Sequence, residues 1–289
     1  MQIQTGWTQR VARTQTIMSA ARQILWEDKT LLLLPIASSA CLMLLTASFA
    51  VPAILGALTG ASASDELSQT GSLSYVAMFL FYVVTYGVAI FFNAALAICV
   101  LRKLEGKQAT ILEGLREALS CFPQILGWAL VSATIGVVLK AIERRSGIVG
   151  NMVARMLGLA WSVATFLVVP VLVAERKGPL EAVQASVQLI RRTWGEDLLA
   201  GLGFGLLYFF WAIPGVFALI IGAGMIASHP ILAIAIMVLS ILYFPLLGLV
   251  LSTMSTIFDV VLYRYARFGT ITRGFDRHLL QTSFVTKPT

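Results

Sequence analysis

The chain has 289 residues, of which 58% are hydrophobic and 12% are charged, and its mean hydropathy is +0.86. Soluble domains carry roughly a quarter of charged residues, so this composition excludes an ordinary soluble globular protein. The net charge of +7 comes mainly from basic residues near the ends of apolar runs. It therefore predicts contact with anionic lipid head groups and not with nucleic acid.

Six long apolar stretches fill most of the chain between short polar breaks. About 20 apolar residues in a helix cross the ~30 Å hydrocarbon layer of a bilayer. Continuous apolar runs favour helices over the alternating strands of a barrel. We predict an all-α polytopic membrane protein of three helical hairpins, forming a single domain over 1–289, with spans at about 31–58, 73–101, 122–142, 152–174, 198–226 and 231–262. The last span exceeds the bilayer thickness and should tilt or protrude.

The six-span bundle, 31–262, is flanked by an amphipathic N-terminal segment (1–30) and a tail (263–289). An amphipathic segment, with apolar and basic residues at helical spacing, precedes each hairpin, at about 11–27, 109–120 and 179–194. This pattern predicts helices lying in the membrane interface, anchored by Trp26 and Trp194. Residues 19–28 resemble 186–197 with a short insertion, which indicates a threefold internal repeat.

The distribution of basic residues predicts the orientation. With both termini in the cytoplasm, only four of the 21 Lys and Arg residues face outward: Lys140, Arg144, Arg145 and Arg155. The positive-inside rule favours this arrangement. The four outward cations are a candidate contact for an anion or a lipid phosphate, and simple solvation of the loop is the alternative.

Three residues place polarity or a helix break inside the predicted spans: Asn93, Pro170 and Asp259. Polar groups within a membrane are candidate functional residues, and a proline frees a backbone carbonyl. One hypothesis is a polar cavity that opens to the cytoplasm. In the other, Asn93 bonds a neighbouring helix, and Asp259 reaches the interface or pairs with an arginine.

Small residues four apart predict close helix packing, as at Gly201 with Gly205 and at Ser132 with Gly136. The glycines of 201–205 do not form a nucleotide-binding motif, because they open an apolar span with no preceding strand.

The sequence predicts neither a metal nor a cofactor. Its two histidines, His229 and His278, fall on opposite sides of the predicted membrane, whereas metal hydrolases cluster their ligands. Cys41, Cys99 and Cys121 lie in or beside spans, so we expect small apolar side chains and no structural disulfide.

A series of short motifs resembles an uncharacterised bacterial family of six-span membrane proteins, domain of unknown function 6159. They are FFNAAL (91–96), LEG (104–106), GWAL (127–130), ERRSG (143–147), AW (160–161), VVPVL (168–172), TWGE (193–196) and LYRYA (262–266). The chain is more remotely similar to the membrane domain attached to some glycerophosphodiester phosphodiesterases. The resemblance implies the fold and a location in the bacterial cytoplasmic membrane. It implies no catalytic residue, since the phosphodiesterase activity of such relatives belongs to a separate soluble domain.

Three functions fit these observations. The first is a non-enzymatic membrane protein that binds lipid, a protein partner or a second copy of itself and supports membrane or envelope organisation. The second is a transporter or channel with a cavity around Asn93 and Asp259; parallel hairpin repeats and scarce intramembrane charge count against it. The third, an intramembrane enzyme, has the weakest support.

Overall fold

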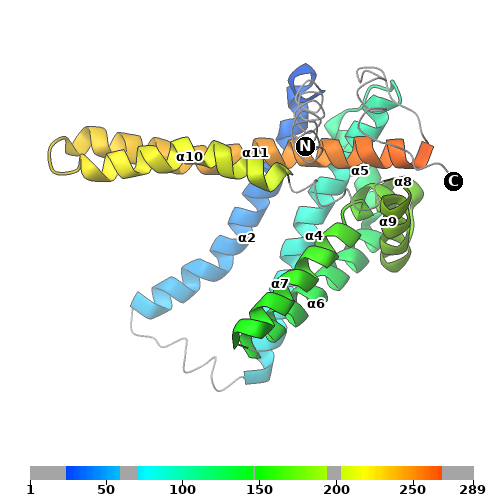
Figure 1. Cartoon of the computed structure of the whole chain (residues 1–289), viewed down its shortest axis with the longest axis horizontal. Coiled ribbons are helices and arrows are strands. Elements are labelled where there is room, and N and C mark those ends of the chain that lie inside the picture. The colour runs from blue at the N-terminus through cyan, green and yellow to red at the C-terminus, as the bar shows by residue number, and fades with distance from the viewer. Residues whose placement is uncertain (1–23, 59–70, 146, 194–202, 269–289) are drawn as a thin grey trace, which may run out of the picture. The chain divides into compact units, whose positions relative to one another are not determined.

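A computed structural model describes residues 24–58, 71–145, 147–193 and 203–268, and within these residues every regular element is a helix (Figure 1). Contacts divide the chain into two units, Leu33–Arg191 and Met1–Leu32 with Arg192–Thr289.

The larger unit contains seven helices in its described part. In chain order they are α2 (Leu33–Leu58), α4 (Gly71–Leu104), α5 (Ile111–Ser120), α6 (Phe122–Arg145), α7 (Gly147–Ala164), α8 (Val168–Glu175) and α9 (Pro179–Thr193). The helix α4 is central, since α2, α5, α6 and α8 all pack against it. From Ala94 to Val100 no residue of α4 is more than 3% exposed, as expected for a helix covered on every side.

The smaller unit contains η1 (Lys29–Leu32), α10 (Gly203–Gly224) and α11 (Pro230–Phe268) in its described part. Two glycines let α10 and α11 approach closely. A Cβ atom on Gly215 would lie 2.8 Å from Cδ1 of Tyr243, and one on Gly222 would lie 2.8 Å from Cγ of Met237. The Tyr243 hydroxyl also donates a hydrogen bond to the carbonyl oxygen of Trp211. These contacts make α10 and α11 a tightly packed hairpin.

Five stretches of the described chain are helical, long and apolar enough to cross a membrane: Lys29–Pro52, Met78–Leu104, Phe122–Glu143, Gly150–Glu175 and Pro230–Phe268. They coincide with five of the six predicted spans, which confirms several membrane-compatible apolar helices. The remaining prediction, 198–226, corresponds to α10, whose apolar part is the shorter Tyr208–Gly224; residues 198–202 lie outside the description. The helix α11 has 39 residues, or about 58 Å, so it extends beyond the predicted 231–262.

The segments predicted to precede the hairpins are helical where described. Of 11–27, residues 24–27 form helix. The second segment is α5, which begins with a capping box: the Glu113 N–H donates to the Thr110 hydroxyl, and the Thr110 N–H donates to the Glu113 carboxylate. The third segment is α9, with Pro179 at its first position, where a missing N–H is harmless.

The fourth predicted span is two helices and not one. The helix α7 ends at Ala164, a turn covers 165–167, and α8 begins at Val168. Pro170 follows directly after the interruption, which suits a residue that has no N–H for the carbonyl four positions earlier and whose ring clashes with that carbonyl in a continuous helix. In α8 it lies in the first turn, where helix N–H groups have no partner in the helix.

A side chain of α9 satisfies the broken backbone. The N–H of Leu167 donates a hydrogen bond of 3.2 Å to Oγ of Ser186, and Ser186 is fully buried. A buried N–H without a partner is costly. The start of α9 is also fixed, because a Cβ on Gly127 of α6 would lie 2.9 Å from Cγ of Pro179.

We expect Ser186→Ala to lower the free energy of unfolding by about 1–3 kcal/mol, because the Leu167 N–H then stays buried without its acceptor. The thermal midpoint of the purified protein in detergent measures this effect. Ser39→Ala is the matched control, since the exposed Ser39 hydroxyl bonds only to Pro35 O of its own helix. Equal midpoints for the two variants would contradict the role of Ser186.

Candidate functional site: a cleft between α4, α6 and α7

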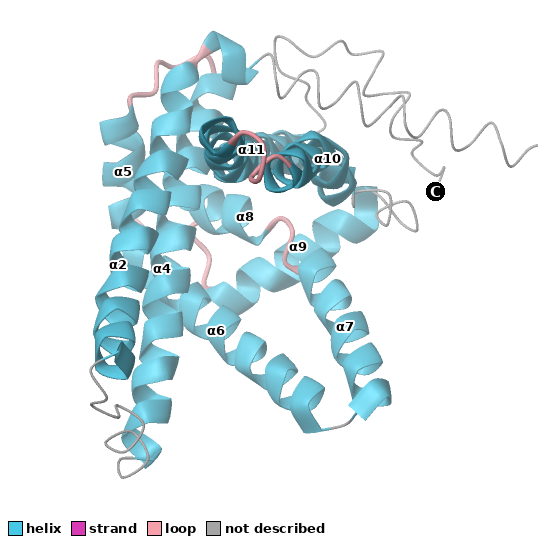
Figure 2. Ribbon diagram, turned by 90° about the vertical axis from the view of Figure 1, so that its left-hand side faces the viewer, coloured by secondary structure: helices cyan, strands magenta, loops and turns pink. Residues whose placement is uncertain are grey.

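An open cleft of about 700 Å³ lies among α4, α6 and α7 of the larger unit. Figure 2 shows α6 and α7 as the two arms of one hairpin, with α4 on the side of α6. Its lining residues are mostly apolar or aromatic, with several hydroxyl groups and one cation: Tyr86, Ile90, Trp128, Ser132, Ile135, Gly136, Leu139, Arg155, Gly158, Leu159, Trp161, Ser162 and Thr165.

Small residues create the space. Ser132 and Gly136 are four apart on α6, and Gly158 and Ser162 are four apart on α7, so each pair lies on one helix face. A Cβ on Gly136 would lie 3.8 Å from Oη of Tyr86, which is ordinary van der Waals contact. The volume is therefore space that larger side chains at these positions would fill.

Two tryptophans line the cleft away from the α6–α7 turn. The rings of Trp128 and Trp161 stack with centroids 5.9 Å apart and an interplanar angle of 24°. Trp128 is only 5% exposed, so it is held firmly. Directly after the end of α7, the Thr165 hydroxyl donates to the Trp161 carbonyl oxygen. The cleft thus reaches the turn where the fourth span breaks.

Two cations lie toward the α6–α7 turn. Arg155 lines the cleft from α7 and is exposed. Lys140 follows the cleft-lining Leu139 on α6. Its Nζ donates to Oη of Tyr82 at 3.4 Å and lies 5.7 Å from the centroid of that ring, a cation–π geometry.

The structure gives different surroundings to the four cations predicted as an anion contact. Arg155 lines the cleft and Lys140 is next to a lining residue. Arg144 and Arg145 close α6, but their side chains lie outside the description.

The three residues of the predicted polar cavity are divided between the two units. Asn93 is half-buried in α4 and Pro170 is buried in α8, and these helices pack together. Asp259 belongs to α11 in the smaller unit, where its Oδ1 is buried with no hydrogen-bond partner in the described chain. A cavity formed by all three stays a prediction.

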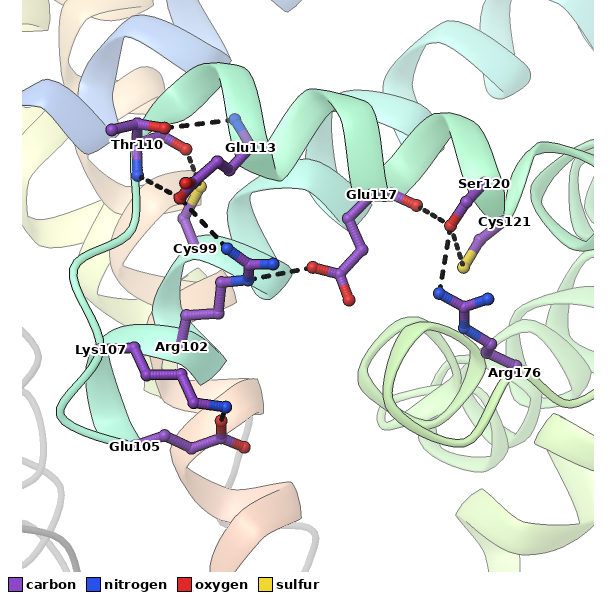
Figure 3. Close-up of polar contacts among 10 residues, drawn as sticks. All are labelled: Cys99, Arg102, Glu105, Lys107, Thr110, Glu113, Glu117, Ser120, Cys121 and Arg176. Atoms are coloured by element: carbon purple, nitrogen blue, oxygen red, sulfur yellow. Dashed lines mark hydrogen bonds and ion pairs between the residues drawn. The ribbon is translucent and has the colours of Figure 1, made fainter.

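A second polar cluster joins α4 to α5 (Figure 3). Arg102 of α4 forms ion pairs with Glu113 (3.1 Å) and Glu117 (3.0 Å) of α5. The two helices also approach closely at Gly114, where an added Cβ would collide with Sγ of Cys99. All three charged side chains are partly exposed, and we interpret the cluster as ion pairs that join α5 to α4 and not as a binding site.

The end of α5 is linked by a hydrogen bond to the end of α8. Ser120 Oγ accepts a hydrogen bond of 3.3 Å from Nη2 of Arg176 (Figure 3). Arg176 has φ of 50° and ends α8 in the left-handed conformation. Beside it, Lys177 pairs with Glu175 at 2.6 Å.

The remaining predicted residues are the tryptophan anchors and the helix-packing glycines. Trp26 is 66% exposed, with Nζ of Lys29 5.3 Å from its ring centroid; Trp194 and Gly201 lie outside the description. Gly205 is in α10. The glycines at close approaches of α10 to α11 are Gly215 and Gly222.

The described residues contain no cluster of three or more His, Cys, Asp or Glu able to hold a metal ion. The three cysteines are free, Cys41 exposed and Cys99 and Cys121 buried.

Sequence reasoning missed the cleft itself. The Ser132–Gly136 spacing was the available signal, but it predicted helix packing. The pairing of Trp128 with Trp161 depends on the α6–α7 hairpin register, which spacing alone does not reveal.

Comparison with known proteins identifies a family. The family described as "Family of unknown function (DUF6159)" matches residues 72–274. No curated protein matches the chain, and no solved structure does.

Proposed function

Because the chain belongs to the DUF6159 family of unknown function, we propose a function from its geometry: a non-enzymatic multi-pass membrane protein that binds a lipid chain in the cleft between α4, α6 and α7. Through that lipid, or through a protein partner or second copy, it supports membrane or envelope organisation. The observation that carries the proposal is the open, mostly apolar cleft of about 700 Å³.

A lipid chain suits this cleft because the surface around it is itself apolar. The lining residue Leu159 is 53% exposed, and on the same helix Met152 and Met156 are 61% and 64% exposed. Exposed apolar side chains on a long apolar helix face acyl chains in a bilayer. A lipid tail can therefore enter from the side without crossing water.

The lining residues do not suggest a reaction. Their polar groups are hydroxyls, indoles and one guanidinium, with no carboxylate or histidine among them, whereas acid–base catalysis needs a group that titrates near neutral pH. The remote similarity to glycerophosphodiester phosphodiesterases stays an expectation and contributes no activity to the proposal.

We place the protein in a bacterial cytoplasmic membrane with both termini in the cytoplasm, on the positive-inside rule. The α6–α7 turn then faces outward, while α5 and α9 face inward. The exposed Leu112 and Leu119 of α5 and Leu180 of α9 (76%, 59% and 69%) are suited to the membrane interface, next to anionic head groups.

Filling the cleft tests the proposed function. We expect Gly136→Leu to remove most of the lipid that co-purifies with the protein, because the new side chain occupies the space of the tail. Native mass spectrometry of the detergent-solubilised protein counts bound lipids. Gly248→Leu in α11 is the matched control, since no neighbouring atom lies within 4 Å of a Cβ there. The same lipid adducts on all three proteins would overturn the proposal.

Cysteine labelling tests the orientation. With Cys41, Cys99 and Cys121 replaced by Ala, we expect an impermeant maleimide applied to intact cells to label Glu143→Cys but not Lys107→Cys. Both positions are exposed, so permeabilised cells should label both. The reverse pattern in intact cells would invert the topology.

A transporter or channel is the second candidate. The observations that favour it are the buried Oδ1 of Asp259 and the buried Nη1 of Arg264, neither with a hydrogen-bond partner in the described chain. Ionisable groups within apolar helices are costly and often mark ion or proton pathways.

Proton flux separates the two candidates. In proteoliposomes with an internal pH dye, we expect the wild-type protein to conduct protons no faster than protein-free vesicles do. Flux that Asp259→Asn abolishes, and that Asp28→Asn outside the long apolar helices leaves intact, would favour the transporter or channel instead.

A further inference from the structure

The cleft has a chemically distinct end, toward the α6–α7 turn, which we call the cationic end and define by Arg155 and Lys140. We propose that the cleft selects lipids with an anionic phosphate head group, with Arg155 binding the phosphate and Lys140 adding a second positive charge. This inference rests on the proposed function and names the lipid class of the same site.

The hairpin register places both cations at this end. A Cβ on Gly158 would lie 3.9 Å from Cδ1 of Leu139, so these positions face each other across α6 and α7. Arg155 is three residues before Gly158, and Lys140 is one residue after Leu139. The two helices are antiparallel, and the turn joins the end of α6 to the start of α7. Both cations therefore lie between this contact and the turn.

Arg155 is a cation among apolar side chains, which favours pairing with an anion. It is five residues inside the apolar stretch Gly150–Glu175, and its neighbours on α7 include the exposed apolar Val153, Met156 and Leu157. A guanidinium next to acyl chains either extends to the head groups or pairs with an anion. Its planar donors match phosphate oxygens, and its place in the lining directs it to a ligand in the cleft.

The ammonium group of Lys140 is held beside Tyr82 but can still donate further hydrogen bonds. Its contact with Tyr82 fixes the ammonium beside the ring. The hydrogen bond to Tyr82 uses one of its three N–H groups, and the residue stays exposed. A phosphate near Arg155 therefore gains a second cation at the same end.

The local charge is strongly positive. Residues 140–155 contain four basic side chains and one acid, Glu143, a balance of +3. A zwitterionic head group brings its own cation into this field, whereas a net anionic one does not. The field therefore favours the anionic lipid.

The opposite end of the cleft suits a tail. Thr165, directly after α7, is ten residues after Arg155, or about 15 Å at the rise of a helix. The stacked Trp128 and Trp161 line the cleft toward that end. A phosphate at Arg155 thus leaves about 15 Å of mostly apolar cleft for an acyl chain.

The test compares two lipids with identical dioleoyl chains, phosphatidylglycerol and phosphatidylcholine, titrated onto the purified full chain in detergent and quantified by native mass spectrometry. We expect phosphatidylglycerol to bind about tenfold more tightly, the size of one charge-assisted contact. Arg155→Gln should remove most of this preference and leave phosphatidylcholine binding intact. Retained phosphatidylcholine binding also shows that the variant is folded.

Further variants sharpen the test. Arg155→Lys should keep part of the preference, and Lys140→Gln should reduce it less than Arg155→Gln does. Arg116→Gln, which removes an exposed cation of α5, is the matched control and should keep the full preference. An unchanged preference in Arg155→Gln, or an equal loss in Arg116→Gln, would refute the inference.

The result is separable from that of the proposed function. If Gly136→Leu abolishes binding of both lipids while the wild-type protein binds them equally, the cleft holds a tail and the phosphate assignment fails. If Gly136→Leu changes nothing, the cleft is not the lipid site and both proposals fail.

Discussion

One buried hydrogen bond, from the Leu167 N–H to the Ser186 hydroxyl, satisfies the backbone where the fourth predicted span breaks. A helix surrounded by apolar side chains satisfies its own backbone hydrogen bonds. Where such a helix is interrupted, the freed backbone groups need a donor or acceptor from another element. The buried serine supplies an acceptor from α9. This lets α7 end at Ala164 and α8 start anew at Val168, and it ties α9 to the turn between them.

The cleft follows from what α6 and α7 lack. Helices in lipid gain little from burying apolar surface against each other, so their association depends on close packing. Here no neighbouring helix fills the space beside the small residues of α6 and α7, and a volume of about 700 Å³ remains open. Trp128 and Trp161 toward one end and Arg155 toward the other give this space a polarity, which in the proposed complex matches a phospholipid from tail to phosphate.

Much of the fold was accessible from the sequence, because long apolar runs and helix-start signals are local. The helices at 111–120 and 179–193 and five long apolar helices lie where the pattern predicts them. Pro170 indicated a break in the fourth span, but the exact turn depends on Ser186, which is 19 residues from its partner. The site was less accessible, since Ser132 and Gly136 carry the same signal whether a helix fills the space beside them or leaves it open. Lys140 and Arg155 could be grouped from topology alone, whereas their relation to Tyr82 and to the lining of α7 required the register between helices.

The contact of Gly114 with Cys99 has a consequence for how α5 can be observed. A Cβ added to Gly114 would collide with Sγ of Cys99, so α5 covers this thiol while it packs against α4. Cys99 is 1% exposed, so separation of α5 from α4 would uncover its thiol. Chemical modification of this thiol would therefore report local opening between α4 and α5, the two helices that Arg102 also joins through its ion pairs.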